Sequence, residues 1–211
     1  MGNIFKTIMA LMLTALPLAS CNATSGDKSA EHQQSKQSIM EGKRVLVAFF
    51  SRSGENYGVG DIKVGNTQKV AELIAGKTGG ATFHIETIRP YASDYQTCVD
   101  EARREKESGA RPEIKGDIDV ESYDVIFIGY PNWWGDCPMA VYTFIGKHDW
   151  KGKTVVPFCT HEGCGLSGTE SNLRKACVGA TVLKGLALRG TTAQNDEKTS
   201  QEAVNKWIDK L

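Results

Sequence analysis

Short apolar runs alternate along the chain with segments of helical periodicity, and this alternation limits the fold more than any other feature. Residues 45–50 and 124–129 form nearly continuous apolar runs, which is typical of strands buried on both faces of a sheet. Strands that alternate with helices predict a parallel sheet covered on both sides, whose ligands bind at the carboxyl ends of the strands. Further strands are expected over residues 82–88, 154–159 and 182–188, and helices over residues 70–77, 94–109, 139–146, 171–177 and 196–211.

The N-terminal residues are typical of a bacterial export signal. Lys6 precedes the apolar segment 7–17, which is too short to span a bilayer, and Leu-Ala-Ser-Cys21 resembles the lipobox at which a cysteine becomes lipidated. We therefore expect residues 1–20 to be a lipoprotein signal peptide, Cys21 to carry the lipid, and residues 21–42 to form a polar tether. An ordinary secretory signal that contains a cysteine is the alternative. On the lipoprotein interpretation, one folded domain over residues 43–211 is anchored to a membrane of the cell envelope.

Charge and cysteine content exclude several kinds of partner and site. The 25 basic and 25 acidic residues balance, whereas nucleic acids select an excess of Lys and Arg, so nucleic acid is not expected as a partner. No metal site is predicted, because the four histidines lie in separate segments and no CxxC motif accompanies Cys159 and Cys164. If Cys21 carries a lipid, an odd number of cysteines remains, so at least one thiol is free or pairs outside the chain. Those cysteines are Cys98, Cys137, Cys159, Cys164 and Cys177.

The first loop at the predicted ligand edge follows residues 45–50. Its segment Ser51–Tyr57 and its end at Val64–Thr67 combine hydroxyls, glycines and an arginine before a helix. Backbone N–H groups and the helix dipole favour an anion at such a place, typically phosphate. The glycine spacing matches neither the Walker A motif nor the dinucleotide fingerprint. A polar loop with a helix N-cap at Asn66 or Thr67 is the alternative.

The second and third loops follow the next two strands of the predicted sheet. Tyr130–Pro138 contains adjacent tryptophans, which predict a planar ligand stacked on an indole, unless both rings only cover the end of the sheet. Thr160–Gly168 is rich in glycine and hydroxyls and carries His161, which alone could be a general base, a metal ligand or a capping residue. A serine hydrolase fits poorly because the chain has no G-x-S-x-G elbow.

Together these loops resemble the three flavin-binding loops of flavodoxin-like proteins, over residues 44–211. The resemblance implies a three-layer α/β fold with a five-stranded parallel sheet of order 2-1-3-4-5, helices on both faces, and non-covalently bound FMN. It implies that the FMN phosphate lies on Ser51, Arg52, Ser53, Asn66 and Thr67. The residues implied to surround the flavin ring are Pro131, Asn132, Trp133, Trp134, Gly135, Thr160, His161, Glu162, Gly163 and Gly165.

The phosphate loop departs from the compact flavodoxin pattern. Residues Glu55–Gly65 are inserted, and we expect this segment to fold over the phosphate or ribose, with Asn56 or Tyr57 in contact. The balanced charge is a second departure, because electron-carrier flavodoxins are markedly acidic and dock on basic partners.

The resemblance implies that the flavin carries the redox chemistry while the protein tunes it. Gly135 is expected to offer its carbonyl to the reduced ring, Glu162 to oppose negative charge if it points inward, and His161 to balance that charge or deliver a proton. A catalytic His161 and a merely structural one remain open. Three functions stay possible: a membrane-tethered one-electron carrier for a redox partner protein, a nicotinamide-dependent reductase of a small acceptor such as a quinone or disulfide, and a flavin-free binding module.

Overall fold

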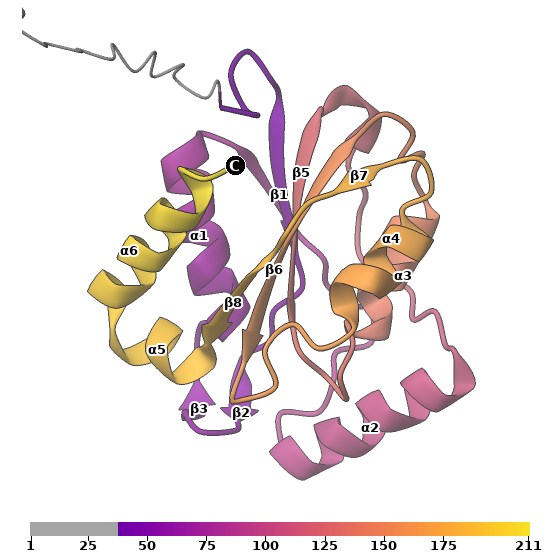
Figure 1. The fold of residues 1–211 in the computed structure, drawn as a ribbon. Helices are drawn as coiled ribbons and strands as arrows, with labels where there is room; N and C mark the ends of the chain where they lie inside the picture. The colour runs from indigo at the N-terminus through magenta and orange to yellow at the C-terminus, as the bar shows by residue number, and fades with distance from the viewer. Residues whose placement is uncertain (1–37) are drawn as a thin grey trace, which may run out of the picture. The chain divides into compact units, whose positions relative to one another are not determined.

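A parallel β-sheet forms the centre of the computed structural model, which describes residues 38–211 (Figure 1). The predicted signal peptide, Cys21 and residues 22–37 lie outside the described residues. The strand order is β4-β1-β5-β6-β7, with β8 pairing to β6 beyond β7, and every pair in this sheet is parallel. The order 2-1-3-4-5 expected from the sequence is therefore confirmed. The strands are β1 (Val45–Phe49), β4 (Ala81–His84), β5 (Val125–Pro131), β6 (Thr154–His161), β7 (Thr181–Val182) and β8 (Leu186–Arg189).

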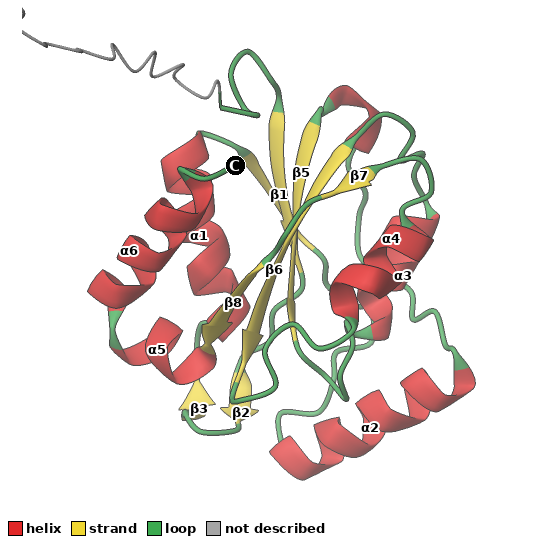
Figure 2. Cartoon of the chain, in the orientation of Figure 1, coloured by secondary structure: helices red, strands yellow, loops and turns green. Residues whose placement is uncertain are grey.

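Helices cover both faces of the sheet, and the apolar runs supply a core to each face (Figure 2). In β1, Val45 and Val47 pack with α1, whereas Leu46 and Ala48 join the cluster beneath α3. Because successive side chains of a strand point to opposite faces, a strand buried on both sides must be apolar throughout. One face carries α1 (Asn66–Thr78), α5 (Gly190–Asn195) and α6 (Glu197–Ile208), and the other carries α3 (Met139–Gly146) and α4 (Thr169–Ala176).

Helix α2 (Tyr95–Ser108) lies apart from both layers. It crosses below the carboxyl ends of the strands, with only Cys98 and Ala102 buried (Figure 1). Asp94 caps its first turn by accepting a hydrogen bond from the Thr97 N–H, and Gly109 ends it in the left-handed conformation. A 3₁₀ turn, Val120–Ser122, then leads into β5. The sequence predicts α2 but not its position at the ligand-binding edge.

The last strand is broken, in contrast to the continuous strand expected over residues 182–188. Val155 pairs with Val182 and Phe158 pairs with Leu186, so one extra residue is accommodated between β7 and β8. The break lies opposite Pro157, which has no N–H to donate to the ladder. The Val155 carbonyl points toward the last strand and accepts from the Leu183 N–H. Pro157, two residues later in β6, faces the same strand. Pro157 therefore lies within a continuous β6, and the extra residue is taken up by the neighbouring strand.

The inserted segment of the first loop forms a small antiparallel hairpin, which the sequence analysis did not predict. Its strands are β2 (Gly54–Asn56) and β3 (Gly60–Ile62). The expected strand over residues 82–88 is also shorter than predicted, because β4 ends at His84 and only a single bridge, from Thr87 to Ile114, follows.

No helix within residues 38–211 has the length and hydropathy needed to cross a membrane. The five cysteines of this region are free thiols, and four of them are buried. Burial raises the pKa of Cys98 to about 11 and that of Cys177 to about 12, so both remain protonated at neutral pH. Cys164 is the exposed one.

The tight contact between β5 and β6 gives a test of the packing. A methyl group on Gly129 would stand 2.0 Å from Cζ of the fully buried Phe158. We expect Gly129→Ala to lower the free energy of unfolding by about 2 kcal/mol, measured by urea denaturation. Gly146→Ala is the matched control, because its added carbon would meet no atom within 4 Å and alanine favours a helix. Equal unfolding midpoints for Gly129→Ala and the wild type would contradict this packing.

Candidate functional site

The three loops singled out from the sequence meet at the carboxyl edge of the sheet. The hydroxyls of Thr67 and Thr160, both buried, are 2.8 Å apart and join the first loop to the third. Asn132 joins the second loop to the third: its N–H donates to the Thr160 carbonyl at 2.8 Å, and its side-chain amide donates to the Gly165 carbonyl at 2.8 Å. These bonds hold the loops together without a ligand.

The junction between the first loop and α1 leaves no room for any residue but glycine at position 65. A Cβ on Gly65 would stand 2.2 Å from Ser51 Oγ and 2.5 Å from the Arg52 carbonyl oxygen. Ser51 Oγ accepts from the Gln68 N–H at 3.0 Å, while the N–H groups of Asn66 and Thr67 find no acceptor within residues 38–211. The helix therefore presents free donors at its positive end, the arrangement that binds an anion.

The Arg52 side chain is used inside the protein. Its guanidinium donates to the carbonyls of Glu55 (2.7 Å), Ala92 (2.9 Å) and Ser93 (2.7 Å). Arg52 thus ties the inserted hairpin to the segment that precedes α2. The backbone of Arg52 lies at the proposed phosphate loop, but its charged group is directed to these three carbonyl oxygens.

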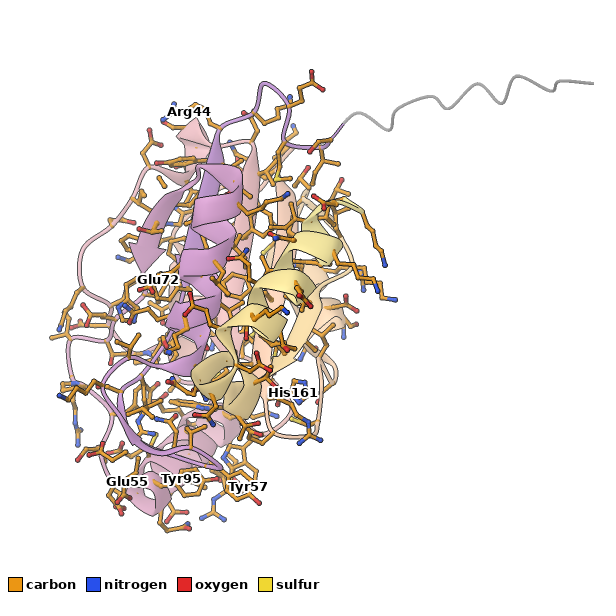
Figure 3. The ribbon with its side chains drawn as sticks, turned by 90° about the vertical axis from the view of Figure 1, so that its left-hand side faces the viewer. Arg44, Glu55, Tyr57, Glu72, Tyr95 and His161 are labelled. Carbon is orange, nitrogen blue, oxygen red and sulfur yellow. The ribbon has the colours of Figure 1, made fainter. Side chains whose placement is uncertain are left out.

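The inserted hairpin bridges two sides of the edge. Near α2, the Glu55 carboxylate accepts from the Tyr95 N–H at 3.2 Å, and the rings of Tyr57 and Tyr95 lie 6.1 Å apart (Figure 3). At its tip, a Cβ on Gly58 would lie 3.1 Å from the Thr191 methyl carbon and 3.4 Å from the Glu162 carboxyl carbon. The hairpin therefore spans from α2 to the start of α5, across the mouth of the site.

The two tryptophans have different surroundings. The Trp133 ring is half-buried edge-on against Phe50 (centroids 5.3 Å apart) and Tyr91 (5.0 Å). The Trp134 ring is 50% exposed, and its indole N–H donates to the Val99 carbonyl of α2 at 3.2 Å. The Trp133 ring therefore covers the end of the sheet, which is the alternative to stacking on a ligand, whereas the Trp134 ring lies beside α2.

A tight turn over Trp133–Asp136 separates these two rings. Trp133 and Asp136 exchange two backbone hydrogen bonds, of 2.9 and 3.0 Å. Trp134 (φ 54°) and Gly135 (φ 76°) both adopt left-handed backbone, as a type I′ turn requires. Such a conformation is uncommon for tryptophan, and two bonds support it: Gly135 N–H donates to Asn132 Oδ1, and Lys106 donates to the Trp134 carbonyl.

In the third loop, His161 and Glu162 serve local structure. His161 Nδ1 accepts from the Gly163 N–H at 2.9 Å, and burial followed by the charge of Arg189 lowers the pKa of the imidazole. The Glu162 carboxylate accepts from the N–H (2.6 Å) and hydroxyl (3.1 Å) of Thr191, which satisfies the first turn of α5. Glu162 is therefore directed to α5, and His161 is a neutral imidazole at neutral pH.

Asn66 also points toward the start of α5. A Cβ on Gly190 would collide with Asn66 Nδ2 at 2.2 Å and approach Glu162 Oε1 at 2.9 Å, so the two side chains converge on this glycine. Asn66 Oδ1 is buried and has no hydrogen-bond partner within the described residues. A buried oxygen without a partner is unusual and fits the contact of a polar ligand at this position.

A partly apolar pocket of about 260 Å³ adjoins the Trp loop. One wall is α2, through Tyr95, Cys98 and Val99, and the other consists of Trp133 and Trp134. Ligand pockets combine such apolar walls with a few placed polar groups, here Asn56 and Asn132. Residues 38–211 contain no group of three or more side chains that could hold a metal ion. The carboxyl edge of the sheet therefore combines a candidate anion site with an aromatic pocket.

Two contributors to this edge were not found from the sequence. Tyr91 packs against Trp133, and its hydroxyl donates to Glu105 of α2 at 2.5 Å. Burial is the main cause that raises the pKa of Tyr91 far above its usual range, so the hydroxyl stays protonated. Tyr91 belongs to a polar connecting segment with no motif. The only signal for α2 was its helical spacing, which does not reveal where the helix docks.

Comparison with known proteins adds a family and several solved structures. A family model described as flavodoxin matches residues 44–211. A candidate flavoprotein from Bacteroides eggerthii DSM 20697 has a TM-score of 0.64 and 31% identity, covering 80% of this chain and 98% of that one. One from Bacteroides uniformis ATCC 8492 has a TM-score of 0.63 and 30% identity, covering 78% and 97%. A search of curated proteins gives no match.

A third structure was solved with a ligand. It is a flavoprotein from Lactobacillus acidophilus NCFM in complex with FMN, with a TM-score of 0.57 and 24% identity, and the match covers 78% of this chain and 98% of that chain. At this identity the likeness shows a shared fold.

The role of Arg52 can be tested on the protein without any ligand. We expect Arg52→Gln to lower the free energy of unfolding by about 2 kcal/mol, because three carbonyls lose a charged donor. Arg174→Gln is the control, since the Arg174 side chain is exposed and makes no hydrogen bond or ion pair within residues 38–211. Urea denaturation measures both variants. If Arg52→Gln were as stable as Arg174→Gln, the guanidinium would not hold the hairpin in place.

Proposed function

Because the chain belongs to the flavodoxin family, we propose that it is a redox protein that binds FMN without a covalent bond. The observation that carries the proposal is the meeting of the three loops at the carboxyl edge, where free helix donors lie beside an aromatic pocket. The Lactobacillus acidophilus flavoprotein, which shares the fold, was solved with FMN.

The residues present fit the phosphate end of this cofactor. Ser51, Ser53 and the N–H groups of Asn66 and Thr67 supply hydrogen-bond donors, and the first turn of α1 contains no acidic residue. Gly65 allows the backbone to come close, as a phosphate loop requires. The buried Asn66 Oδ1 has the chemistry to accept a hydrogen bond from a cofactor hydroxyl.

The residues that would surround the ring lie in the second and third loops. Trp133 and Trp134 offer indole surface, and the loops over residues 131–135 and 160–165 offer backbone groups. Bound FMN supplies the electron-transfer chemistry, and the protein positions it and excludes water. His161 holds its proton at Nε2, because Nδ1 accepts from the Gly163 N–H, so that proton is the one it can donate. Glu162 stays with α5 and stabilises the loop.

A reductase that acts on a small acceptor is the second candidate, and one observation favours it. A pocket of about 620 Å³ lies between α2 and residues 87–91, and Tyr91 forms part of its wall. Tyr91 also packs against Trp133, so the pocket adjoins the proposed flavin loops. This room fits a small substrate, whereas a carrier that docks a protein needs no such space.

Flavin binding, and the number of stages in which the bound flavin is reduced, test the proposal. We expect the full chain, mixed with FMN, to retain visible flavin absorption through gel filtration. In an anaerobic reductive titration, a carrier takes up electrons in two separate one-electron stages, whereas a reductase takes up two at once and is reduced rapidly by NADPH. Absence of protein-bound flavin absorption after addition of FMN would overturn the proposal.

A matched pair of glycine variants isolates the phosphate loop. Gly65→Ala places a carbon 2.2 Å from Ser51 Oγ, and we expect FMN affinity to fall by about tenfold or more. Gly76→Ala, inside α1, adds a carbon that meets no atom within 4 Å and is expected to leave FMN affinity unchanged. Quenching of flavin fluorescence measures both.

We further propose that the protein is tethered to a membrane of the cell envelope through a lipid on Cys21. The support is the sequence Leu-Ala-Ser-Cys21 after a short apolar segment. Acyl chains bind a bilayer through the hydrophobic effect, about 0.8 kcal/mol for each buried CH₂ group. Residues 22–42 would then separate the flavin domain from the bilayer.

Fractionation of the producing cells tests the anchor. We expect wild-type protein in the membrane fraction and Cys21→Ser in the soluble fraction, because serine cannot form the thioether to the lipid. Cys164→Ser, which alters the exposed thiol of the folded domain, is the control and should remain with the membrane. Mass spectrometry of the N-terminal peptide identifies the lipid. Soluble wild-type protein with an unmodified Cys21 would contradict the anchor.

A further inference from the structure

A polar cavity of about 300 Å³ lies beside the first loop, on the side of β4. The loop contributes Ser51 and Ser53 to its wall, and α1 contributes Gln68. Two lysines also line it: Lys63 comes from the end of the inserted hairpin and Lys115 from the segment before β5. Hydroxyls and ammonium groups around one cavity are the chemistry that binds phosphate.

Arg52 lines this cavity, but three hydrogen bonds already commit most of its five N–H groups inside the protein. Its guanidinium is held by three backbone carbonyls that fix the hairpin. His84 is also engaged, because its Nε2 lies 3.1 Å from the Ser51 carbonyl oxygen and therefore donates to it. The cations of the cavity wall whose side chains make no hydrogen bond within residues 38–211 are the two lysines.

The two lysines differ in what surrounds them. Lys63 makes no hydrogen bond or ion pair with any residue in 38–211. Lys115 has one acidic neighbour, Glu86, at 3.9 Å, and both side chains are about half exposed. Glu86 is the one carboxylate in the cavity wall, so Lys63 carries a charge that no carboxylate of residues 38–211 pairs with.

We propose that this cavity binds a phosphate monoester and that Lys63 is its principal cation. The inserted segment would then have a chemical purpose: it brings a positive charge to a phosphate loop whose arginine is used in holding the segment in place. The proposal rests on the proposed function where the phosphate is that of FMN itself. The same chemistry would accept the phosphate of a second ligand, and the two sources are distinguished by experiment.

The test compares FMN with riboflavin, which lacks the phosphate, on the full chain. We expect Lys63→Gln to weaken FMN binding by about tenfold and to leave riboflavin binding unchanged, both measured by quenching of flavin fluorescence. Lys63→Arg should retain most of the affinity. Lys175→Gln removes an exposed lysine outside the cavity, which makes no hydrogen bond or ion pair within residues 38–211, and should have no effect. Added salt should weaken FMN binding more in the wild type than in Lys63→Gln.

A second arm uses inorganic phosphate as the probe, with binding followed by calorimetry. Competition between phosphate and FMN in the wild type, reduced in Lys63→Gln, assigns the cavity to the FMN phosphate. Binding of phosphate to the FMN-loaded wild type, lost in Lys63→Gln, assigns it to a second ligand. The proposal is overturned if Lys63→Gln weakens FMN and riboflavin equally, or changes neither FMN nor phosphate binding. If the wild type binds no flavin, the proposed function fails, while the phosphate arm still tests the cavity on the flavin-free protein.

Discussion

Burial on both faces of the sheet is the constraint on which the rest of the structure depends. Every side chain of β1, and of β5 as far as Ile128, packs into one of the two cores, so none of them is free for chemistry. A parallel sheet also places all its carboxyl ends at one edge. The polar loops after β1, β5 and β6 therefore meet at that edge. The location of the site is thus a consequence of how the core is built.

At that edge, one arginine decides the shape of the mouth. The resemblance of the first loop to a phosphate loop implies that Arg52 binds the phosphate, yet its guanidinium bridges the hairpin and the segment before α2. A guanidinium with five N–H groups can donate to several carbonyl oxygens at once. The inserted hairpin is thus held by Arg52 of its own loop, although an arginine at this place in a phosphate loop is usually interpreted as a ligand-binding residue.

The regular elements could be predicted from the sequence because their patterns report burial directly. The runs at residues 45–50 and 125–129 have no polar position inside them, and this requires strands with two covered faces. The hairpin β2–β3 could not be predicted, because its strands have three residues each and read Gly-Glu-Asn and Gly-Asp-Ile. Periodicity needs a longer window than that.

Within the site, the sequence indicated which loops meet but not what individual side chains do. The partners of Arg52 include carbonyls 40 and 41 positions later, and any residue type supplies a carbonyl. The same holds for Trp134, whose indole donates to a carbonyl of α2. Glu162 is recognisable as acidic, but only the fold shows that it binds the first turn of α5. Contacts to the backbone at long range leave no pattern in the sequence.

The short helix α5 connects parts of the site to the C-terminal end of the chain. Glu162 binds its first turn, Gln194 donates to the Val64 carbonyl at the end of the hairpin, and α6 follows directly after it. Order in the third loop and in the hairpin is therefore energetically linked to local unfolding of α5 and α6. We expect a ligand that stabilises those loops to slow amide hydrogen exchange as well in the last 22 residues, 190–211.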